Sequence, residues 1–147
     1  MISRIEIEGV DKTGKDLIAG YIDRLSNRRY VVNARGLLSM MVYSDIYNRG
    51  YNYENELKDN KNTLVVYLTA EKEDLEIRHK LSNEPKIDIE RDLKVFEDYA
   101  EVFEKAGITV LKCNTSHMTP YNVAKFVLSY IKSEEEKKWE FWLKVLE

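Results

Sequence analysis

The sequence predicts a single α/β domain of three layers, in which a short, mostly parallel β-sheet lies between helices. Short segments rich in β-branched residues alternate with segments of helical periodicity, and strands joined through helices run parallel. Residues 63–68 are almost continuously apolar, which is typical of a strand covered on both faces. A chain of 147 residues, 44% hydrophobic and 33% charged, fits one globular domain.

The N-terminal half predicts two strand–helix pairs. Residues 5–9 alternate apolar and acidic side chains, which indicates a short strand, and apolar residues then recur at helical spacing over 17–25. β-branched and aromatic residues over 29–33 predict a second strand. Residues 37–47 predict a second helix. Residues 48–62 have turn chemistry and predict a loop with one helical turn at 54–58.

The C-terminal half contains the strongest helix signal. After the third strand, residues 71–81 predict a helix and residues 82–86, which include a proline, break it. Residues 88–106 place apolar side chains in one stripe, and Gly107 supplies a helix stop. Residues 108–113 predict the last strand. Thr119 and Pro120 predict the start of a final helix through residue 131, and residues 133–147 continue its periodicity.

Composition excludes several classes of protein. No apolar run is long enough to span a membrane, and an acidic residue interrupts the apolar N-terminal stretch, so we expect a cytoplasmic protein without membrane contact. The single cysteine excludes an internal disulfide framework and a multi-cysteine zinc site. A net charge of −3 gives no general footprint for nucleic acid, although a local basic patch stays open.

Gly9, Gly14 and Lys15 form the Walker A pattern G-x-x-x-x-G-K between a predicted strand and a predicted helix. Glycines let the backbone wrap a polyphosphate, its N–H groups point inward, and the helix N-terminus adds positive potential. The pattern predicts a P-loop NTPase-like fold with Lys15 on the β- and γ-phosphates. The simpler alternative is a glycine turn that only joins strand to helix.

Asp16 breaks the pattern, because the residue after the lysine is normally a Ser or Thr whose hydroxyl coordinates Mg²⁺. A carboxylate can also ligate Mg²⁺ and is favourable at a helix N-terminus. Close to phosphate it would repel the ligand unless a cation lies between them. Two outcomes stay open: Asp16 is a direct metal ligand, or nucleotide binding is weakened or lost.

Three segments carry a family resemblance. Residues 8–15, Glu-Gly-Val-Asp-Lys-Thr-Gly-Lys, are similar to the pattern E-G-x-D-(G/K/R)-(S/A/T)-G-K. The stretch from Arg35 to Ser39, followed by Tyr43, resembles D-R-x-x-x-S-x-x-Y, with Ala34 in place of its Asp and the tyrosine one position later. Residues 68–99 give a strand, a helix, a break and a charged helix that resemble a lid and the helix after it. From about residue 5 to 131, the chain resembles the thymidylate kinase family of P-loop nucleotide kinases.

That resemblance implies a P-loop kinase-like domain over residues 1–131, with 132–147 as a C-terminal helical tail. ATP, with Mg²⁺, would be held by the glycine loop, and the implied contacts are Gly9, Lys12, Thr13, Gly14, Lys15, Asp16 and Leu17. The acceptor nucleotide would contact Asp11, Arg35, Ser39 and Tyr43. Charge on the transferred group would be stabilised by Lys15, Arg35, Arg78 and Arg91.

The implied activity is ATP-dependent phosphoryl transfer to a nucleotide-like acceptor, either a deoxynucleoside monophosphate or a nucleotide in a nucleic acid. Two departures favour the alternative of a catalytically inactive module that binds a nucleotide or a partner protein. Ala34 lacks the family's carboxylate, and the interval between Lys15 and Arg35 is much shorter than in that family, which shortens the acceptor side.

Two aromatic clusters have open interpretations. The tyrosines at 43, 47, 51 and 53 could stack a base, or they could cap the core beneath a long loop. The segment 139–146 contains two tryptophans, Phe141 and three aliphatic residues. These side chains could pack on the domain, join two identical subunits in a homodimer, or dock on a different protein partner.

Overall fold

The structure is a computed structural model, and it describes residues 1–83 and 88–147. Four strands form one parallel sheet in the order β2-β1-β3-β4. The strands are β1 (Arg4–Gly9), β2 (Val31–Ala34), β3 (Thr63–Thr69) and β4 (Thr109–Asn114). The helices are α1 (Lys15–Leu25), α2 (Leu37–Ile46), α3 (Glu54–Lys58), α4 (Lys72–Ser82), α5 (Ile89–Lys105) and α6 (Pro120–Leu146).

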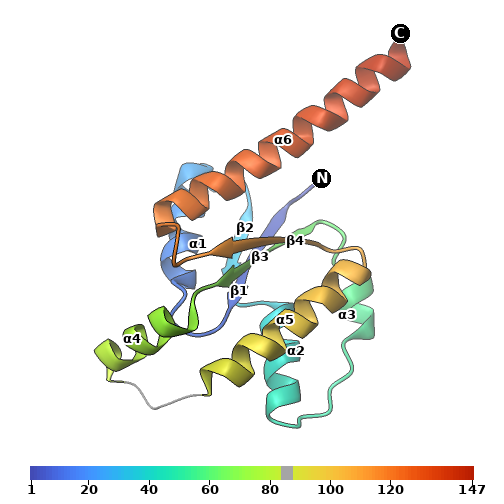
Figure 1. Cartoon of the computed structure of the whole chain (residues 1–147). Coiled ribbons are helices and arrows are strands. Elements are labelled where there is room, and N and C mark those ends of the chain that lie inside the picture. The colour runs from blue at the N-terminus through green and yellow to red at the C-terminus, as the bar shows by residue number, and fades with distance from the viewer. Residues whose placement is uncertain (84–87) are drawn as a thin grey trace.

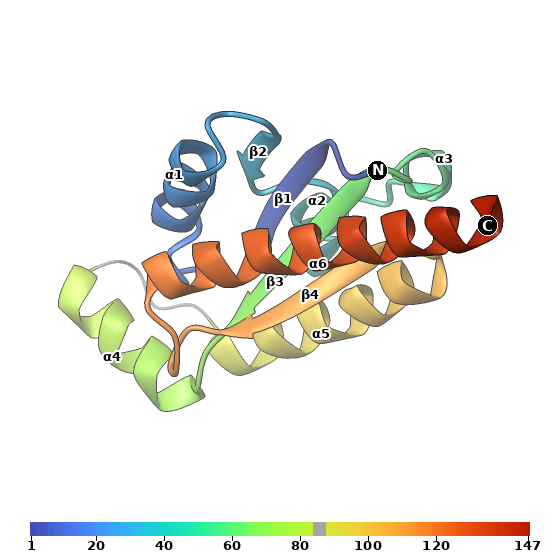
Figure 2. The ribbon, with the colours of Figure 1, turned by 90° about the horizontal axis from the view of Figure 1, so that it is seen from above.

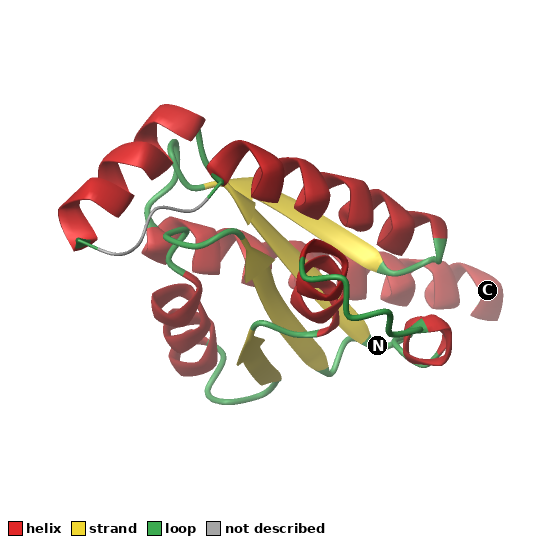
Figure 3. Cartoon of the chain, turned by 90° about the horizontal axis from the view of Figure 1, so that it is seen from below, coloured by secondary structure: helices red, strands yellow, loops and turns green. Residues whose placement is uncertain are grey.

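Helices cover both faces of the sheet (Figure 1). One face is covered by α1 and α6, which pack on each other and are seen from above in Figure 2. The other face is covered by α2 and α5, seen from below in Figure 3. The predicted three-layer α/β fold with a parallel sheet is therefore confirmed.

The third strand shows why its sequence is apolar without alternation. Leu64, Val66 and Leu68 enter the core beneath α1 and α6, whereas Val65 and Tyr67 enter the core beneath α2 and α5. All five side chains are buried. Because helices lie on both sides, residues 63–68 of β3 are shielded from water on both faces, and polar residues would have to be desolvated there.

Side chains cap the N-termini of the last two helices, as the sequence predicts for Thr119, whereas Asp88 precedes the helix in which the sequence placed it. Asp88 caps α5, where its carboxylate accepts a hydrogen bond from the Arg91 N–H at 3.0 Å. Thr119 caps α6 by accepting from the Asn122 N–H at 3.2 Å, and Pro120 follows it. The short helical turn expected at 54–58 is α3.

Some boundaries differ from the sequence prediction. The second strand begins at Val31 rather than at residue 29, because the Arg29 N–H donates to the Ser26 carbonyl at 3.3 Å in the turn that follows α1. Ser82 belongs to α4, and the rest of the expected break at 82–86 lies mostly outside the described residues. The expected division between residues 131 and 132 falls inside one continuous helix, α6, and stays a prediction.

Across residues 1–83 and 88–147, no helix combines the length and the apolar character needed to cross a membrane.

The topology marks one edge of the sheet as a place for a ligand. The chain passes from β1 to β2 on one side and later returns to β3 on the other side of β1. In open parallel sheets, ligands bind outside the carboxyl ends of the strands at such a switch point. The glycine loop, residues 9–14, begins at that end of β1.

Candidate functional site

The glycine loop is tight and has a defined shape. Gly9 has a φ of 143°, and a Cβ there would overlap the backbone carbonyl of Leu68 on β3, so only glycine lets β1 end this close to β3. Gly14 has a φ of 85° and is the N-cap of α1. Between them, the Thr13 hydroxyl donates to the Val10 carbonyl at 2.8 Å.

The Lys15 side chain folds back over this loop. Its ammonium donates to the carbonyl oxygens of Gly9 at 3.0 Å and Val10 at 2.7 Å. Burial lowers the pKa of Lys15 to about 8, with a smaller contribution from the Arg35 charge, while Asp11, Glu8 and Asp16 act in the opposite direction. A cation with a lowered pKa at a helix N-terminus is well suited to an anionic ligand, whose charge would restore the ordinary protonation.

Two buried carboxylates stand on β1, immediately before the loop. Glu6 and Glu8 point toward α2, on the opposite face of the strand from Ile5 and Ile7. A buried carboxylate is costly unless it is hydrogen-bonded, so their partners matter.

Those partners are the backbone groups at the N-terminus of α2. Glu8 accepts from the N–H groups of Gly36 and Ser39, both at 2.8 Å, and from the Ser39 hydroxyl at 2.6 Å. Glu6 accepts from the Leu37 N–H at 3.0 Å. Burial nevertheless raises the pKa of Glu8, against the opposing effect of these hydrogen bonds. The carboxylates thus satisfy donors that a helix N-terminus leaves unpaired.

These carboxylates hold the turn that presents Arg35. Arg35 has a φ of 75°, its N–H donates to the Ile7 carbonyl at 2.8 Å, and its side chain is exposed. The sequence prediction missed the part that Glu6 and Glu8 play. The alternation of acidic and apolar residues over 5–9 is the signal for them, because it puts both carboxylates on one face of a strand.

Four of the predicted site residues share one electrostatic environment. The charges of Arg35 and Asp11 both act on Lys15. Burial, with the nearby charges of Asp92 and Asp11, raises the pKa of Tyr43 to about 12, while Arg35 opposes the shift. The structure therefore brings Lys15, Arg35, Asp11 and Tyr43 together around the loop.

Arg78 on α4 reaches the loop directly. One guanidinium nitrogen donates to the Lys12 carbonyl at 2.9 Å and to the Thr115 hydroxyl at 3.1 Å, and the other donates to the Thr115 carbonyl at 3.2 Å. Arg91 is placed differently, because its guanidinium binds the buried Asp92 carboxylate at 3.0 and 3.1 Å. The contacts of Arg78 thus connect the glycine loop to the segment that follows β4.

The remaining predicted site residues include two exposed residues of α1 and one buried residue of α2. Asp16 and Leu17 are exposed in the first turn of α1. Ser39 is buried, and its hydroxyl donates to Glu8, so its expected contact with a substrate stays a prediction. Within residues 1–83 and 88–147, no three His, Cys, Asp or Glu side chains are grouped to hold a metal ion. A metal here would need ligand oxygens in addition to Asp16.

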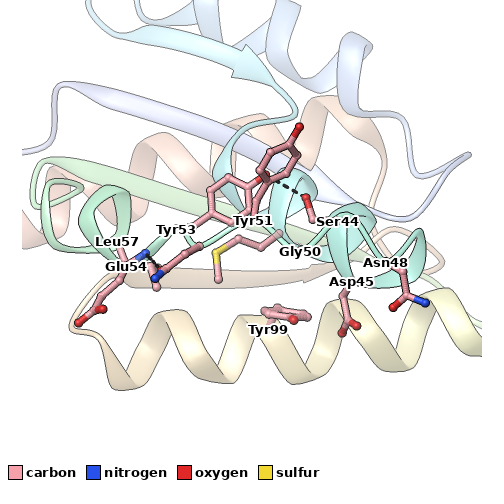
Figure 4. Close-up of a pocket in the computed structure, with 11 residues that line it drawn as sticks. Ser44, Asp45, Asn48, Gly50, Tyr51, Tyr53, Glu54, Leu57 and Tyr99 are labelled. Atoms are coloured by element: carbon pink, nitrogen blue, oxygen red, sulfur yellow. Dashed lines mark hydrogen bonds between the residues drawn. The ribbon is translucent and has the colours of Figure 1, made fainter.

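The tyrosines at 43, 47, 51 and 53 contribute both to the core and to the lining of a cavity. Tyr43 stacks on Tyr47 and meets Phe96 of α5 edge to face. Farther along, Tyr51 and Tyr53 line a cavity of about 590 Å³ between α2, α3 and α5, with Tyr99 on the α5 side (Figure 4). The Tyr53 hydroxyl lies 2.9 Å from the Ser44 hydroxyl on α2. Tyr43 and Tyr53 thus pack against the core beneath α2 and α5, and Tyr53 also lines the open cavity together with Tyr51.

Comparison with known proteins supports the fold. No protein-family model matches the chain, and no curated protein is similar enough to count as a relative. Among solved structures, the chain is similar to the crystal structure of the YorR protein from Bacillus subtilis in complex with phosphorylated GDP. The TM-score is 0.75 at 18% sequence identity, and the match covers 91% of this chain and 98% of that chain. The similarity establishes a P-loop-like α/β fold.

Proposed function

We propose that this chain binds a nucleoside triphosphate at the glycine loop and transfers its terminal phosphoryl group to a nucleotide-like acceptor. The observation that carries the proposal is the Lys15 ammonium, folded over a glycine loop at the N-terminus of α1. The similarity in fold to YorR, which was crystallised with phosphorylated GDP, adds support. ATP is the donor that the resemblance to thymidylate kinases implies.

The proposed reaction needs positioning and positive charge rather than a covalent side chain. An acceptor phosphate oxygen bonds to the terminal phosphorus of ATP as the bond from that phosphorus to the bridging oxygen breaks. The products are ADP and the phosphorylated acceptor. Lys15 and Arg35, whose charges interact, would stabilise the charge that develops on the transferred group. Arg78 would keep the loop in shape through the Lys12 carbonyl.

Mg²⁺ would be held by Asp16 together with phosphate oxygens of the nucleotide. The residues fit this ion, because Mg²⁺ is commonly bound by one or two carboxylates plus substrate phosphates, and the Asp16 side chain is exposed in the first turn of α1. When bound, the ion would neutralise phosphate charge during transfer. It would also remove the repulsion between Asp16 and the nucleotide.

The acceptor would lie on the α2 side of the loop. Asp11, Arg35 and Tyr43 share charge interactions there, and Ser39 is the fourth residue that the resemblance implies. Ala34 removes a carboxylate from this side. The chain between α1 and α2 contains only the short strand β2, so the acceptor side has few structural elements of its own. A nucleotide within a DNA or RNA chain therefore fits this side as well as a free deoxynucleoside monophosphate does.

A catalytically inactive binding module is the second candidate. It is favoured by Asp16 in the position of the metal-binding hydroxyl and by Ala34 in the position of a carboxylate. In that case the loop would hold a nucleotide without turnover, or a partner protein would use the fold as a platform. The two candidates share the nucleotide site and differ in product formation.

Calorimetric titration with ATP or GTP, with and without Mg²⁺, tests the shared site. Lys15→Ala should lose binding, because it removes the cation over the loop. Lys61→Ala is the matched control, since Lys61 is exposed next to the opposite end of the sheet, before β3. Absence of binding to the wild type would contradict both candidates. Radiolabelled transfer to a panel of nucleotides and oligonucleotides then separates the kinase from the inactive module.

Asp16→Ser tests the metal. If Asp16 is a Mg²⁺ ligand, the serine hydroxyl should replace it and preserve Mg²⁺-dependent ATP affinity. If Asp16 only repels phosphate, the same substitution should raise ATP affinity markedly, with or without Mg²⁺. An affinity that neither changes nor depends on Mg²⁺ would contradict both roles.

A further inference from the structure

The C-terminal part of α6 projects from the body of the molecule (Figure 1). Its exposed side chains are largely apolar. From here on, the tail means residues 139–146 only, the apolar end of the longer C-terminal segment. Its six large apolar side chains are each between 56% and 79% exposed, and they are Trp139, Phe141, Trp142, Leu143, Val145 and Leu146. Single exposed apolar residues are ordinary on a protein surface, whereas a contiguous group of this size marks an interaction site.

Most of the tail side chains lie on one face. Trp139, Trp142, Leu143 and Leu146 follow the spacing i, i+3, i+4, i+7, which places them in one stripe of a helix. Three of them, Trp139, Trp142 and Leu146, also line a groove of about 980 Å³. The stripe therefore lines the groove, and its side chains remain largely exposed to solvent.

The groove continues onto the body of the same chain. Its other wall is formed by the N-terminal residues Met1 and Ile2 and by Leu25 and Tyr30 around the end of α1. The Arg29–Glu135 ion pair, at 3.1 Å, ties this wall to α6. One continuous surface thus carries both a protruding apolar helix and an apolar groove. Because α6 is one continuous helix, the tail cannot bend back to fill the groove of its own chain.

We propose that the groove is filled by the tail of a second copy of this chain, in a two-fold symmetric dimer. A two-fold interface uses the same patch on both subunits, so the patch must be complementary to itself. A surface that carries a helix and a groove meets this requirement, because each tail enters the partner's groove while its own groove receives the partner's tail. The proposal does not depend on the proposed nucleotide site.

The available area fits a stable dimer. At their exposed fractions, Trp139 and Trp142 of the stripe present on the order of 300 Å² of surface, and Leu143 and Leu146 bring this to roughly 500 Å² per copy. Pairing would cover two tails and two groove walls together, which reaches the class of about 1,200–2,000 Å² that specific interfaces bury. A foreign protein would have to supply a matching helix and wall, which a second copy already has.

Sedimentation equilibrium of the full chain tests the proposal. The wild type should sediment as a dimer of the 17.3 kDa chain at micromolar concentration. The variant Leu143→Glu/Leu146→Glu should be a monomer, because it places four carboxylates in the paired stripe. The matched control is Ile77→Glu/Leu81→Glu on α4, which changes two equally exposed apolar residues and should stay dimeric. Far-ultraviolet circular dichroism confirms that each variant is folded.

Tryptophan fluorescence gives a second measurement, and the result for the wild type is informative even if the variant does not fold. Trp139 and Trp142 are the two tryptophans of the sequence, so the emission reports on the tail alone. In the wild type, both should resist acrylamide quenching, and the Leu143→Glu/Leu146→Glu variant should be quenched freely with emission at longer wavelength.

Several results would overturn the dimer. These are a monomeric wild type, a variant that stays dimeric, a control that becomes monomeric, or wild-type tryptophans that are quenched as freely as those of the variant. A chain that is monomeric alone and associates only with a different protein would also overturn it.

Discussion

Glu8 and Ser39 are joined by two hydrogen bonds, one from the Ser39 backbone N–H at 2.8 Å and one from the Ser39 hydroxyl at 2.6 Å. Both residues are buried, and Glu8 lies immediately before the glycine loop. The contact therefore ties the N-terminus of α2 to the strand that carries the loop. Arg35, which precedes α2 and acts on Lys15 through its charge, is positioned by the same turn.

Ser39→Ala should lower the free energy of unfolding by about 1.5–3 kcal/mol, since a buried hydrogen bond to a charged group is lost. Urea denaturation measures this change, with the exposed Ser133→Ala on α6 as the control. If Ser39→Ala lowered nucleotide affinity and left the free energy of unfolding unchanged, the hydroxyl would instead contact the substrate.

Gly36→Ala should destabilise the protein because the added Cβ would overlap the Glu6 carboxylate. That carboxylate accepts from the Leu37 N–H, so it has to give up this bond when it moves away. In the background of Glu6→Ala, the same substitution should cost much less, because the clash has been removed. A double-mutant cycle on unfolding free energies should therefore give a coupling of about 1 kcal/mol or more. Additive effects would contradict the contact.

Nucleotide binding should weaken as the pH rises through about 8, because the pKa of Lys15 in the free protein is lowered to about 8 by burial. Bound phosphate favours the charged ammonium and raises that pKa again, so binding takes up a proton in the range where free Lys15 is neutral. The affinity should fall by at most about tenfold per pH unit above this value.

Calorimetry in buffers of different ionisation enthalpy measures the proton uptake directly. Lys15→Arg keeps its charge across this range, so its binding should be nearly independent of pH between 8 and 10. A wild-type affinity that stays constant over the same range would show that Lys15 is not the group that meets the phosphates.

Arg78→Ala should loosen the glycine loop in the absence of nucleotide, because Arg78 donates to the Lys12 carbonyl and to both the hydroxyl and the carbonyl of Thr115. Hydrogen exchange of the loop amides, residues 10–15, should become faster. The exposed Arg49→Ala should leave that exchange unchanged. If Arg78 acted only as a lid cation, Arg78→Ala would reduce nucleotide affinity and leave the exchange of the free protein as it is.

Local chemistry made much of the fold predictable. Gly107 and the stripe from Ile89 to Phe103 predicted α5, and Thr119 with Pro120 predicted the start of α6. The glycine spacing at 9 and 14 predicted the loop between β1 and α1. Each of these signals acts within a few residues of the structure it specifies, so a single sequence contains it. The second strand starts two residues later than the sequence predicts, because the turn after α1 extends to Arg29, whose N–H donates to the Ser26 carbonyl.

The sequence alone determined the parallel α/β architecture and the glycine loop, since periodicity, capping and backbone freedom are local properties. Tertiary structure alone decided what the charged side chains do. Glu8 and Ser39 are 31 positions apart, and Arg78 lies 66 positions from the Lys12 carbonyl that it binds. It also decided that the tail projects from the body with its apolar face open. Hydrogen bonds and burial depend on which elements meet in space, and local patterns carry no information about distant partners.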